Sequence, residues 1–343
     1  MRKLLNTLFV TSDDLYLSIE NENVVAWREQ TAVGRIPLLS LENICYFGYR
    51  GASPALLGAC AERHIGFSFL TQSGRFLART VGKSAGNIFL RKEQYRVSDN
   101  EEKSLRIASA MISGKILNAR SIVMRAMRDH PLSFDEELFG LYVKEMKQSA
   151  VSAAHAENLE ELRGIEGNAA HMYFSLFDAM ILNDKKNFFF YSRSKRPPLD
   201  RINALLSLAY TVLAHDCASA LEAVGLDAYA GFLHRDRPGR QSLALDLMEE
   251  LRSIYVDRFI LTIINNRILN AKHFSVFEDG AVTLKDEGRK IFFERWQERK
   301  RETITHPFLE EKIYWGLIPF VQALLLARTL RGDLDGYPPF LWK

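Results

Sequence analysis

Residues 105–123, LRIASAMISGKILNARSIV, decide the fold class of the larger part of the chain. Apolar and small side chains recur there every three or four positions, which places them on one broad stripe of an α-helix. The members of the stripe are Leu105, Ala108, Met111, Ile112, Lys115, Ile116, Ala119 and Val123. This pattern predicts a long amphipathic helix near the start of a helical domain.

The helical period continues through most of the remaining chain. It predicts helices over 134–154, 156–182, 201–224, 243–269, 285–301 and 319–330, with Ser133, Asp200 and Ser242 as capping residues. One segment differs, because Asp279-Gly280 separates two β-like runs within 274–284. That segment predicts a small hairpin among the helices.

The first 85 residues have a different pattern, with short β-like runs separated by turn residues. The runs cover 4–10, 15–19, 24–28, 44–47, 65–70 and 76–81. One helix over 55–63 is predicted after Ser53-Pro54, a good N-cap and first-turn pair. We therefore expect an α+β protein, with a β-rich N-terminal domain over residues 1–85 and a larger α-helical domain over residues 86–343.

Composition limits the possible classes of function. The net charge of +3 is too small to indicate a polyanionic partner, so a nucleic-acid surface must come from locally clustered cations. Three cysteines without a CxxC pair predict reduced thiols, and we expect a cytoplasmic protein without a membrane span. The sequence contains no Walker loop, Rossmann fingerprint or GxSxG elbow, which argues against nucleotide hydrolysis and acyl transfer.

Two segments contain isolated residues that could bind a metal. In RGIEGN, residues 163–168, Glu166 lies between two glycines at a predicted helix start or kink, where small neighbours leave the carboxylate accessible. In GFLHRDRPGR, residues 231–240, His234 lies in a loop beside arginines. For each residue taken alone, an ordinary side chain without a metal is the more frequent case.

A third segment, SLALDLMEELR over residues 242–252, predicts a capped amphipathic helix. Asp246 and Glu249 are three positions apart and share a face of this helix, close to its apolar residues. Glu250 and Arg252 are expected to be more solvated. An ordinary charged helix face is the alternative.

Together these residues form an oxygen-rich ligand set that suits Mg²⁺ or Mn²⁺. Such an ion supports phosphodiester chemistry, because it polarises a phosphoryl oxygen and offsets charge on the leaving oxygen. Cations for binding phosphate lie nearby in the sequence: Lys195, Arg196, Arg235, Arg237 and Arg240. The segments predict a metal-dependent enzyme that acts on nucleic acid.

At these segments the chain resembles the CRISPR-associated integrase family, the first of the two universal spacer-acquisition proteins, and especially its subtype I-C branch. The resemblance extends over essentially the whole chain. It includes Leu5 to Thr11, the Gly51-Ala52-Ser53-Pro54 step, the Glu-Gly pair at Glu166, and the run from Gly231 to Arg252.

The resemblance implies that Glu166, His234 and Glu249 are the metal ligands. Asp246 is then a supporting residue or an alternative third ligand. It also implies a homodimer with an N-terminal dimerisation domain, two homodimers around a dimer of the small second acquisition protein, and an iron–sulfur nuclease that trims the prespacer.

The function implied is attack of a prespacer 3′-hydroxyl on a phosphodiester of the CRISPR repeat, and the reverse reaction. Water in place of the hydroxyl would give endonuclease activity. A structural subunit that holds DNA without cutting it is the alternative, since the basic residues need no metal for that role.

Overall fold

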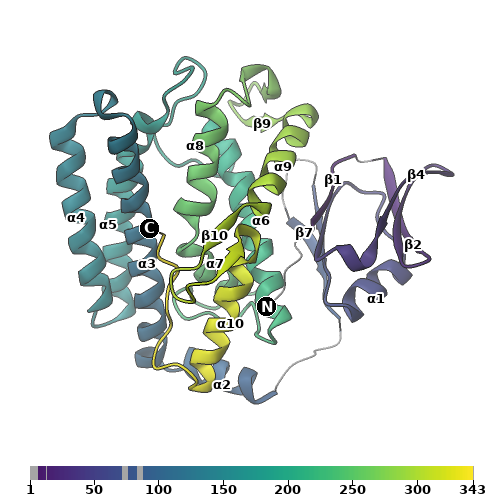
Figure 1. Cartoon of the computed structure of the whole chain (residues 1–343), viewed down its shortest axis with the longest axis horizontal. Coiled ribbons are helices and arrows are strands. Elements are labelled where there is room, and N and C mark those ends of the chain that lie inside the picture. The colour runs from purple at the N-terminus through teal and green to yellow at the C-terminus, as the bar shows by residue number, and fades with distance from the viewer. Residues whose placement is uncertain (1–6, 13, 72–75, 83–87, 343) are drawn as a thin grey trace. The chain divides into compact units, whose positions relative to one another are not determined.

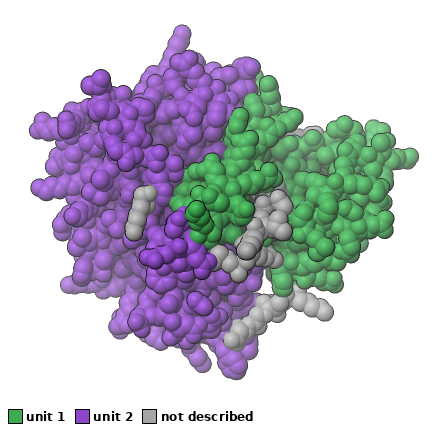
Figure 2. Space-filling view, in the orientation of Figure 1, with its two compact units in different colours: residues 1–86, 285–304, 312–318 green, residues 87–284, 305–311, 319–343 purple. Residues whose placement is uncertain are grey.

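The computed structural model describes residues 7–12, 14–71, 76–82 and 88–342. The chain forms two compact units (Figure 2). The first consists of residues 1–86, 285–304 and 312–318, and the second of 87–284, 305–311 and 319–343. The predicted boundary between residues 85 and 86 lies outside the described residues. Two segments that we assigned to the helical domain, 285–304 and 312–318, belong to the first unit.

The first unit is built on two small sheets. One has the order β1-β5-β6-β7, and the other is the antiparallel meander β2-β3-β4. In the first sheet β1, β5 and β6 are parallel, and β7 pairs antiparallel with β6. The strands are β1 Thr7–Val10, β2 Leu15–Glu20, β3 Asn23–Arg28, β4 Thr31–Pro37, β5 Asn43–Phe47, β6 Gly66–Leu70 and β7 Phe76–Thr80.

Helix α1 (Pro54–Glu62) packs against these strands. Its predicted cap is confirmed, because Ser53 Oγ accepts a hydrogen bond from Leu56 N at 3.2 Å. Helix α9 (Asp286–Arg301) also belongs to this unit, and its Phe293 ring stacks on Phe9 with centroids 4.5 Å apart. Two short strands, β10 Thr303–Thr305 and β11 Lys312–Tyr314, form a separate pair.

The second unit consists mainly of packed helices, and α3, α4 and α5 lie side by side in it (Figure 1). Its helices are α2 Ile88–Ser98, α3 Glu101–Asp129, α4 Glu136–Ala154, α5 Leu159–Phe177, α6 Arg201–Ala223, α7 Ser242–Glu249, α8 Arg258–Asn265 and most of α10 Ile318–Arg331. The predicted stripe of 105–123 is the buried face of α3. The predicted hairpin is also present, as β8 Phe274–Val276 and β9 Val282–Leu284.

The prediction of one continuous helix over 243–269 was wrong, because the helix is interrupted and its last segment ends at Asn265. Helix α7 ends at Glu249, a π-helical segment Arg252–Asp257 follows, and α8 begins at Arg258. A π-turn inserts one extra residue and so rotates the side chains that follow it, a change that apolar periodicity does not reveal. The break directly follows a predicted site residue.

Two predicted caps were also wrong, since Asp135 caps α4 in place of Ser133 and Ser242 is already the first residue of α7. The cap at Asp200 is confirmed, because its carboxylate accepts from Asn203 N at 2.7 Å. Among the described residues, α6 is the one helix long and apolar enough to cross a membrane. Of its most apolar window, 67% is buried inside the structure, as expected of a core helix.

Candidate active site

Glu166 lies in the interior of α5, whose first turn is capped by Asn158. The prediction of a helix start or kink at this position was therefore wrong. Gly164 and Gly167 continue the helix, and apart from adjacent residues and the helix's own backbone nothing lies within 4 Å of the place where either would carry a Cβ. Because its neighbours are small, the Glu166 carboxylate stays accessible, with 28% of its side chain exposed.

His234 is held in place by Asp246 on α7. Its ring Nδ1 lies 2.5 Å from Asp246 Oδ1, and its backbone N donates to the same oxygen at 3.1 Å. The other oxygen, Oδ2, accepts from the backbone N of Phe232 at 2.6 Å and of Leu233 at 2.9 Å. Both oxygens of this fully buried carboxylate are therefore engaged by the loop. The arrangement assigns the ring proton to Nδ1 and leaves Nε2 as the free ligand atom.

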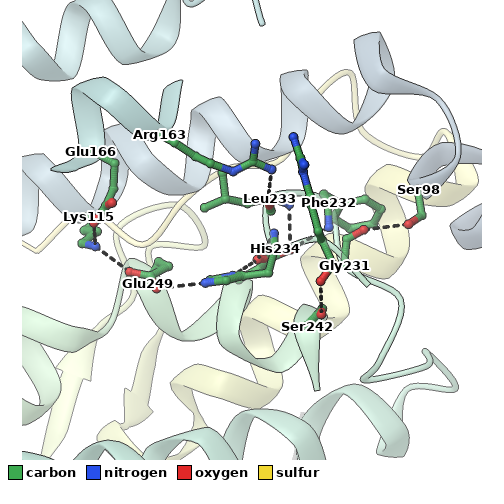
Figure 3. Close-up of polar contacts among 12 residues, drawn as sticks. Ser98, Lys115, Arg163, Glu166, Gly231, Phe232, Leu233, His234, Ser242 and Glu249 are labelled. Carbon is green, nitrogen blue, oxygen red and sulfur yellow. Dashed lines mark hydrogen bonds and ion pairs between the residues drawn. The ribbon is translucent and has the colours of Figure 1, made fainter. Parts of the chain in front are cut away.

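The loop can approach α7 so closely because residue 231 is glycine. A Cβ on Gly231 would lie 2.8 Å from Asp246 Oδ2 and 2.8 Å from the Ser242 Cβ. Two further groups fix the loop: Ser98 Oγ donates to Gly231 O at 2.7 Å, and Arg163 donates to Leu233 O at 2.7 Å (Figure 3).

Glu249, at the end of α7, lies between His234 and a lysine. His234 Nε2 is 4.0 Å from Glu249 Oε1, and Lys115 Nζ is 2.7 Å from Glu249 Oε2. Lys115 also forms an ion pair with Glu166. Figure 3 shows the resulting row of side chains, from Glu166 through Lys115 and Glu249 to His234. Four elements, α3, α5, α7 and the loop before α7, thus supply one continuous polar site.

The charges around Glu249 keep its carboxylate ionised. Burial alone would raise its pKa, but the nearby cations Arg252 and Lys115, together with His234, hold that pKa at about 2. Arg252 contributes directly, with its guanidinium 3.0 Å from Glu249 Oε1. A buried carboxylate that stays anionic is suited to bind a cation.

The chemistry of the residues fits a divalent ion. Two carboxylates and an imidazole form a hard ligand set, and the contact of His234 with Asp246 is the outer hydrogen bond typical of metal-binding histidines. Glu249 Oε2 is buried without a hydrogen bond of acceptable geometry. As the described residues stand, however, no three His, Cys, Asp or Glu side chains are grouped closely enough to hold an ion. The Lys115 ammonium forms ion pairs with both Glu166 and Glu249.

A comparison with protein families identifies the chain. The model of the family CRISPR associated protein Cas1 matches residues 8–298. The chain belongs to the Cas1 family. The family predicted from the sequence is confirmed, whereas the assignment to subtype I-C stays a prediction.

Individual members of the family match over the whole chain. A protein from Chlorobaculum tepidum named CRISPR-associated endonuclease Cas1 1 is 48% identical over 343 residues and covers 100% of both chains. A Geobacter sulfurreducens protein named a CRISPR-associated exonuclease Cas4/endonuclease Cas1 fusion is 35% identical, covering 98% of this chain and 60% of its own. The structure of a Cas1 protein from Thermotoga maritima matches with a TM-score of 0.78 and 24% identity over 100% of both chains. That likeness confirms the predicted α+β class.

The predicted phosphate-binding cations differ in their exposure and in the groups that they contact. Lys195 lines a cavity together with Glu166 and Lys115, and Arg196 is exposed beside it. Of the loop arginines, Arg235 forms an ion pair with Glu160, Arg237 is exposed, and Arg240 is half-buried.

Sequence reasoning missed three residues of this site: Lys115, Arg163 and Arg252. The one available signal was Lys115, a cation on the apolar stripe of α3. The expectation that Glu250 and Arg252 are solvated was wrong, because Glu250 is fully buried and the Arg252 side chain is only 23% exposed.

Proposed function

We propose that the chain is a divalent-metal-dependent DNA endonuclease and integrase of CRISPR adaptation. It joins a prespacer 3′-hydroxyl to a phosphodiester of the CRISPR repeat, and it reverses that reaction. The observation that carries the proposal is the free Nε2 of His234, which faces Glu249 while Asp246 holds the other ring nitrogen. Membership of the Cas1 family supports the same reading.

The ligands proposed are Glu166, His234 and Glu249. Asp246 is the positioning residue, because its two oxygens already accept from the loop and from His234 Nδ1. Mg²⁺ or Mn²⁺ bound there polarises a phosphoryl oxygen and offsets charge on the leaving oxygen. Lys115 holds the two carboxylates together before the ion binds, and its freed ammonium can then pair with a phosphate.

The DNA in this proposal lies along five cations, four of them exposed and Arg240 half-buried. Lys195 and Arg196 contact the backbone on one side, and Arg235, Arg237 and Arg240 contact it on the other. Such contacts position the duplex and make its affinity depend on salt, but they read no base sequence.

The assembly proposed follows the family resemblance. Residues 1–85 form a homodimer interface, and two homodimers bind a dimer of the small second acquisition protein. The proposed assembly also includes a separate iron–sulfur nuclease that trims the prespacer, as the resemblance to subtype I-C members implies. The Geobacter sulfurreducens relative supports this last partner, because its name joins an exonuclease to an endonuclease in one chain.

A branched-DNA assay with Mn²⁺ tests the activity. We expect strand joining and cutting by the wild type, and a loss of at least 100-fold in Glu166→Ala, His234→Ala and Glu249→Ala. His155→Ala is the matched control, since His155 is an exposed histidine at the end of α4. Undiminished product from the first three variants would contradict the site.

A structural DNA-binding subunit is the second candidate, and one observation favours it. Lys115 and Arg252 together already balance the charges of Glu166 and Glu249, because Lys115 pairs with both carboxylates and Arg252 pairs with Glu249. If purified protein binds branched DNA equally well in EDTA and in Mn²⁺, and yields neither cut nor joined strands, this second function is the correct one.

A further inference from the structure

A cavity of about 250 Å³ opens next to the proposed metal ligands, entirely within the second unit. Glu166 and Lys115 are among its lining residues, together with side chains from α4, α5, α6 and the π-helical segment. The volume is just below the roughly 300–1,000 Å³ typical of small-molecule sites, so it accommodates about one base or nucleoside.

One wall of the cavity is apolar and aromatic. Met146 from α4 and Ala169, Ala170, Tyr173 and Phe174 from α5 supply it. The Tyr173 and Phe174 rings are 5.2 Å apart in an edge-on arrangement. A wall of this kind suits a flat, unstacked base, because aromatic side chains bind bases of any sequence through their faces.

A second part of the wall is cationic. Two guanidinium groups lie over the ring of Tyr210, Arg252 at 5.0 Å and Arg193 at 5.5 Å, and the Tyr210 hydroxyl donates to Asp257 at 2.5 Å. Lys195 lies on the same wall. Burial, followed by the cations Arg252 and Arg193, lowers the pKa of Lys195. Lys195 thus lies close to two other cations, and a phosphate among them would reduce their mutual repulsion.

A polar group without a partner also lines the cavity. Ser253, in the π-helical segment, is only 3% exposed, and its Oγ has no hydrogen-bond partner. A buried hydroxyl left unpaired costs free energy unless a ligand or water satisfies it. Because the π-turn follows Glu249, it places Arg252, Ser253 and Asp257 together on the cavity side.

We propose that this cavity is a subsite for one unstacked deoxynucleotide of the reacting DNA. Its base lies against Tyr173 and Phe174, and its phosphate meets Lys195 and Arg252. The inference rests on the proposed function, because Glu166 borders the cavity and belongs to the proposed ligand set. Two nucleotides have the required chemistry: the 3′-terminal one of the joining strand, and the one flanking the scissile phosphate of the target strand.

Binding of abasic DNA in EDTA tests the subsite without any turnover. Branched DNA is prepared in three forms: intact, abasic at the 3′-terminal nucleotide of the joining strand, and abasic at the flanking nucleotide of the target strand. Affinities are measured by fluorescence anisotropy. For the wild type we expect one abasic form to bind about 10-fold more weakly than intact DNA, which identifies the strand that supplies the base.

Filling the cavity should remove that preference. Ala170→Leu projects into the space from α5 and is expected to bind intact and abasic DNA equally, whereas the control Ala154→Leu, exposed on α4, keeps the 10-fold difference. Lys195→Ala removes one cation from an exposed residue, and we expect it to lower the slope of log affinity against log salt concentration by about one phosphate contact.

The subsite is wrong if neither abasic form binds more weakly to the wild type, or if Ala170→Leu keeps the full preference. Either result is distinct from failure of the proposed activity, which appears as missing product in Mn²⁺. If the wild type binds intact DNA more tightly than abasic DNA in EDTA but gives no product in Mn²⁺, the subsite is supported and the proposed activity is wrong.

Discussion

The ring Nδ1 of His234 lies 2.5 Å from Asp246 Oδ1, so one buried carboxylate fixes both the imidazole and the loop that carries it. The same carboxylate accepts from the backbone N atoms of that loop. Asp246 therefore has no oxygen left for an ion. This relationship separates the two acids that share a face of α7, because only Glu249 remains available to complete a ligand set.

Replacing Asp246 by asparagine should weaken metal binding without removing a ligand. The Asn amide would present donors to backbone N–H groups, so His234 would lose its orientation. We expect Mn²⁺ affinity, measured by titration calorimetry, to fall about 10- to 100-fold. Asp236→Asn, in the same loop but exposed, is the matched control and should bind Mn²⁺ as the wild type does. Equal affinity in both variants would mean that Asp246 does not position the histidine.

Lys115→Met tests whether the ammonium and the ion compete for the same carboxylates. Without its cation, Glu166 and Glu249 repel each other, so the variant should unfold at lower temperature in EDTA, at a cost of about 1–3 kcal/mol. Mn²⁺ should raise its melting temperature more than that of the wild type, because the ion no longer displaces a lysine. Lys144→Met, exposed on α4, should change neither quantity. A smaller Mn²⁺ effect in Lys115→Met would show that the lysine assists metal binding.

Much of the fold could be predicted because its elements have strong local patterns. The stripe of α3 and most strands of the first unit follow simple periodicity. Strand β4 was missed because its residues, TAVGRIP, are exposed almost throughout and include Gly34 and Pro37, so no apolar alternation marks it. The attachment of α9 to the first unit could not be predicted, since it depends on contacts such as Phe9 with Phe293.

The ligand types of the candidate site were visible in the sequence, but their surroundings were not. Glu250 follows Glu249 directly and looks equally solvated by residue type, yet groups 72 to 90 positions away cover it. Gln322 and Tyr337 donate to its Oε1 at 2.8 and 2.6 Å, and Phe340 N donates to Oε2 at 3.1 Å. Contacts at such separations leave no periodic signal.

Tyr337→Phe should therefore destabilise the second unit by about 1–3 kcal/mol, because it removes a donor from the fully buried Glu250. Chemical unfolding at neutral pH measures the change. Tyr229→Phe, at a tyrosine that is 46% exposed, is the control and should cost less than about 0.5 kcal/mol. Similar stabilities of the two variants would mean that the chain's last residues do not hold Glu250.

The raised pKa of Asp257 predicts how the free energy of unfolding changes with pH. Burial raises its pKa from 3.8 to about 6, although hydrogen bonds from Tyr210 and Tyr173 oppose the shift. Between about pH 4 and pH 6 the folded state thus holds a proton that the unfolded state has lost. The contribution of Asp257 to the free energy of unfolding is greatest below pH 4 and falls as pH rises through 6, by about 3 kcal/mol in all.

Asp257→Asn isolates this contribution, because the amide keeps an acceptor for Tyr210 and does not titrate. Relative to the wild type, the variant should gain stability as pH rises from 4 to 7, by up to about 3 kcal/mol. Urea unfolding at four pH values measures the difference, and Asp335→Asn, an exposed substitution, should run parallel to the wild type. A difference between Asp257→Asn and the wild type that stays constant with pH would mean that Asp257 titrates alike in the folded and unfolded chain. Its burial beside Tyr210 would then be fully compensated by the hydrogen bonds that it accepts.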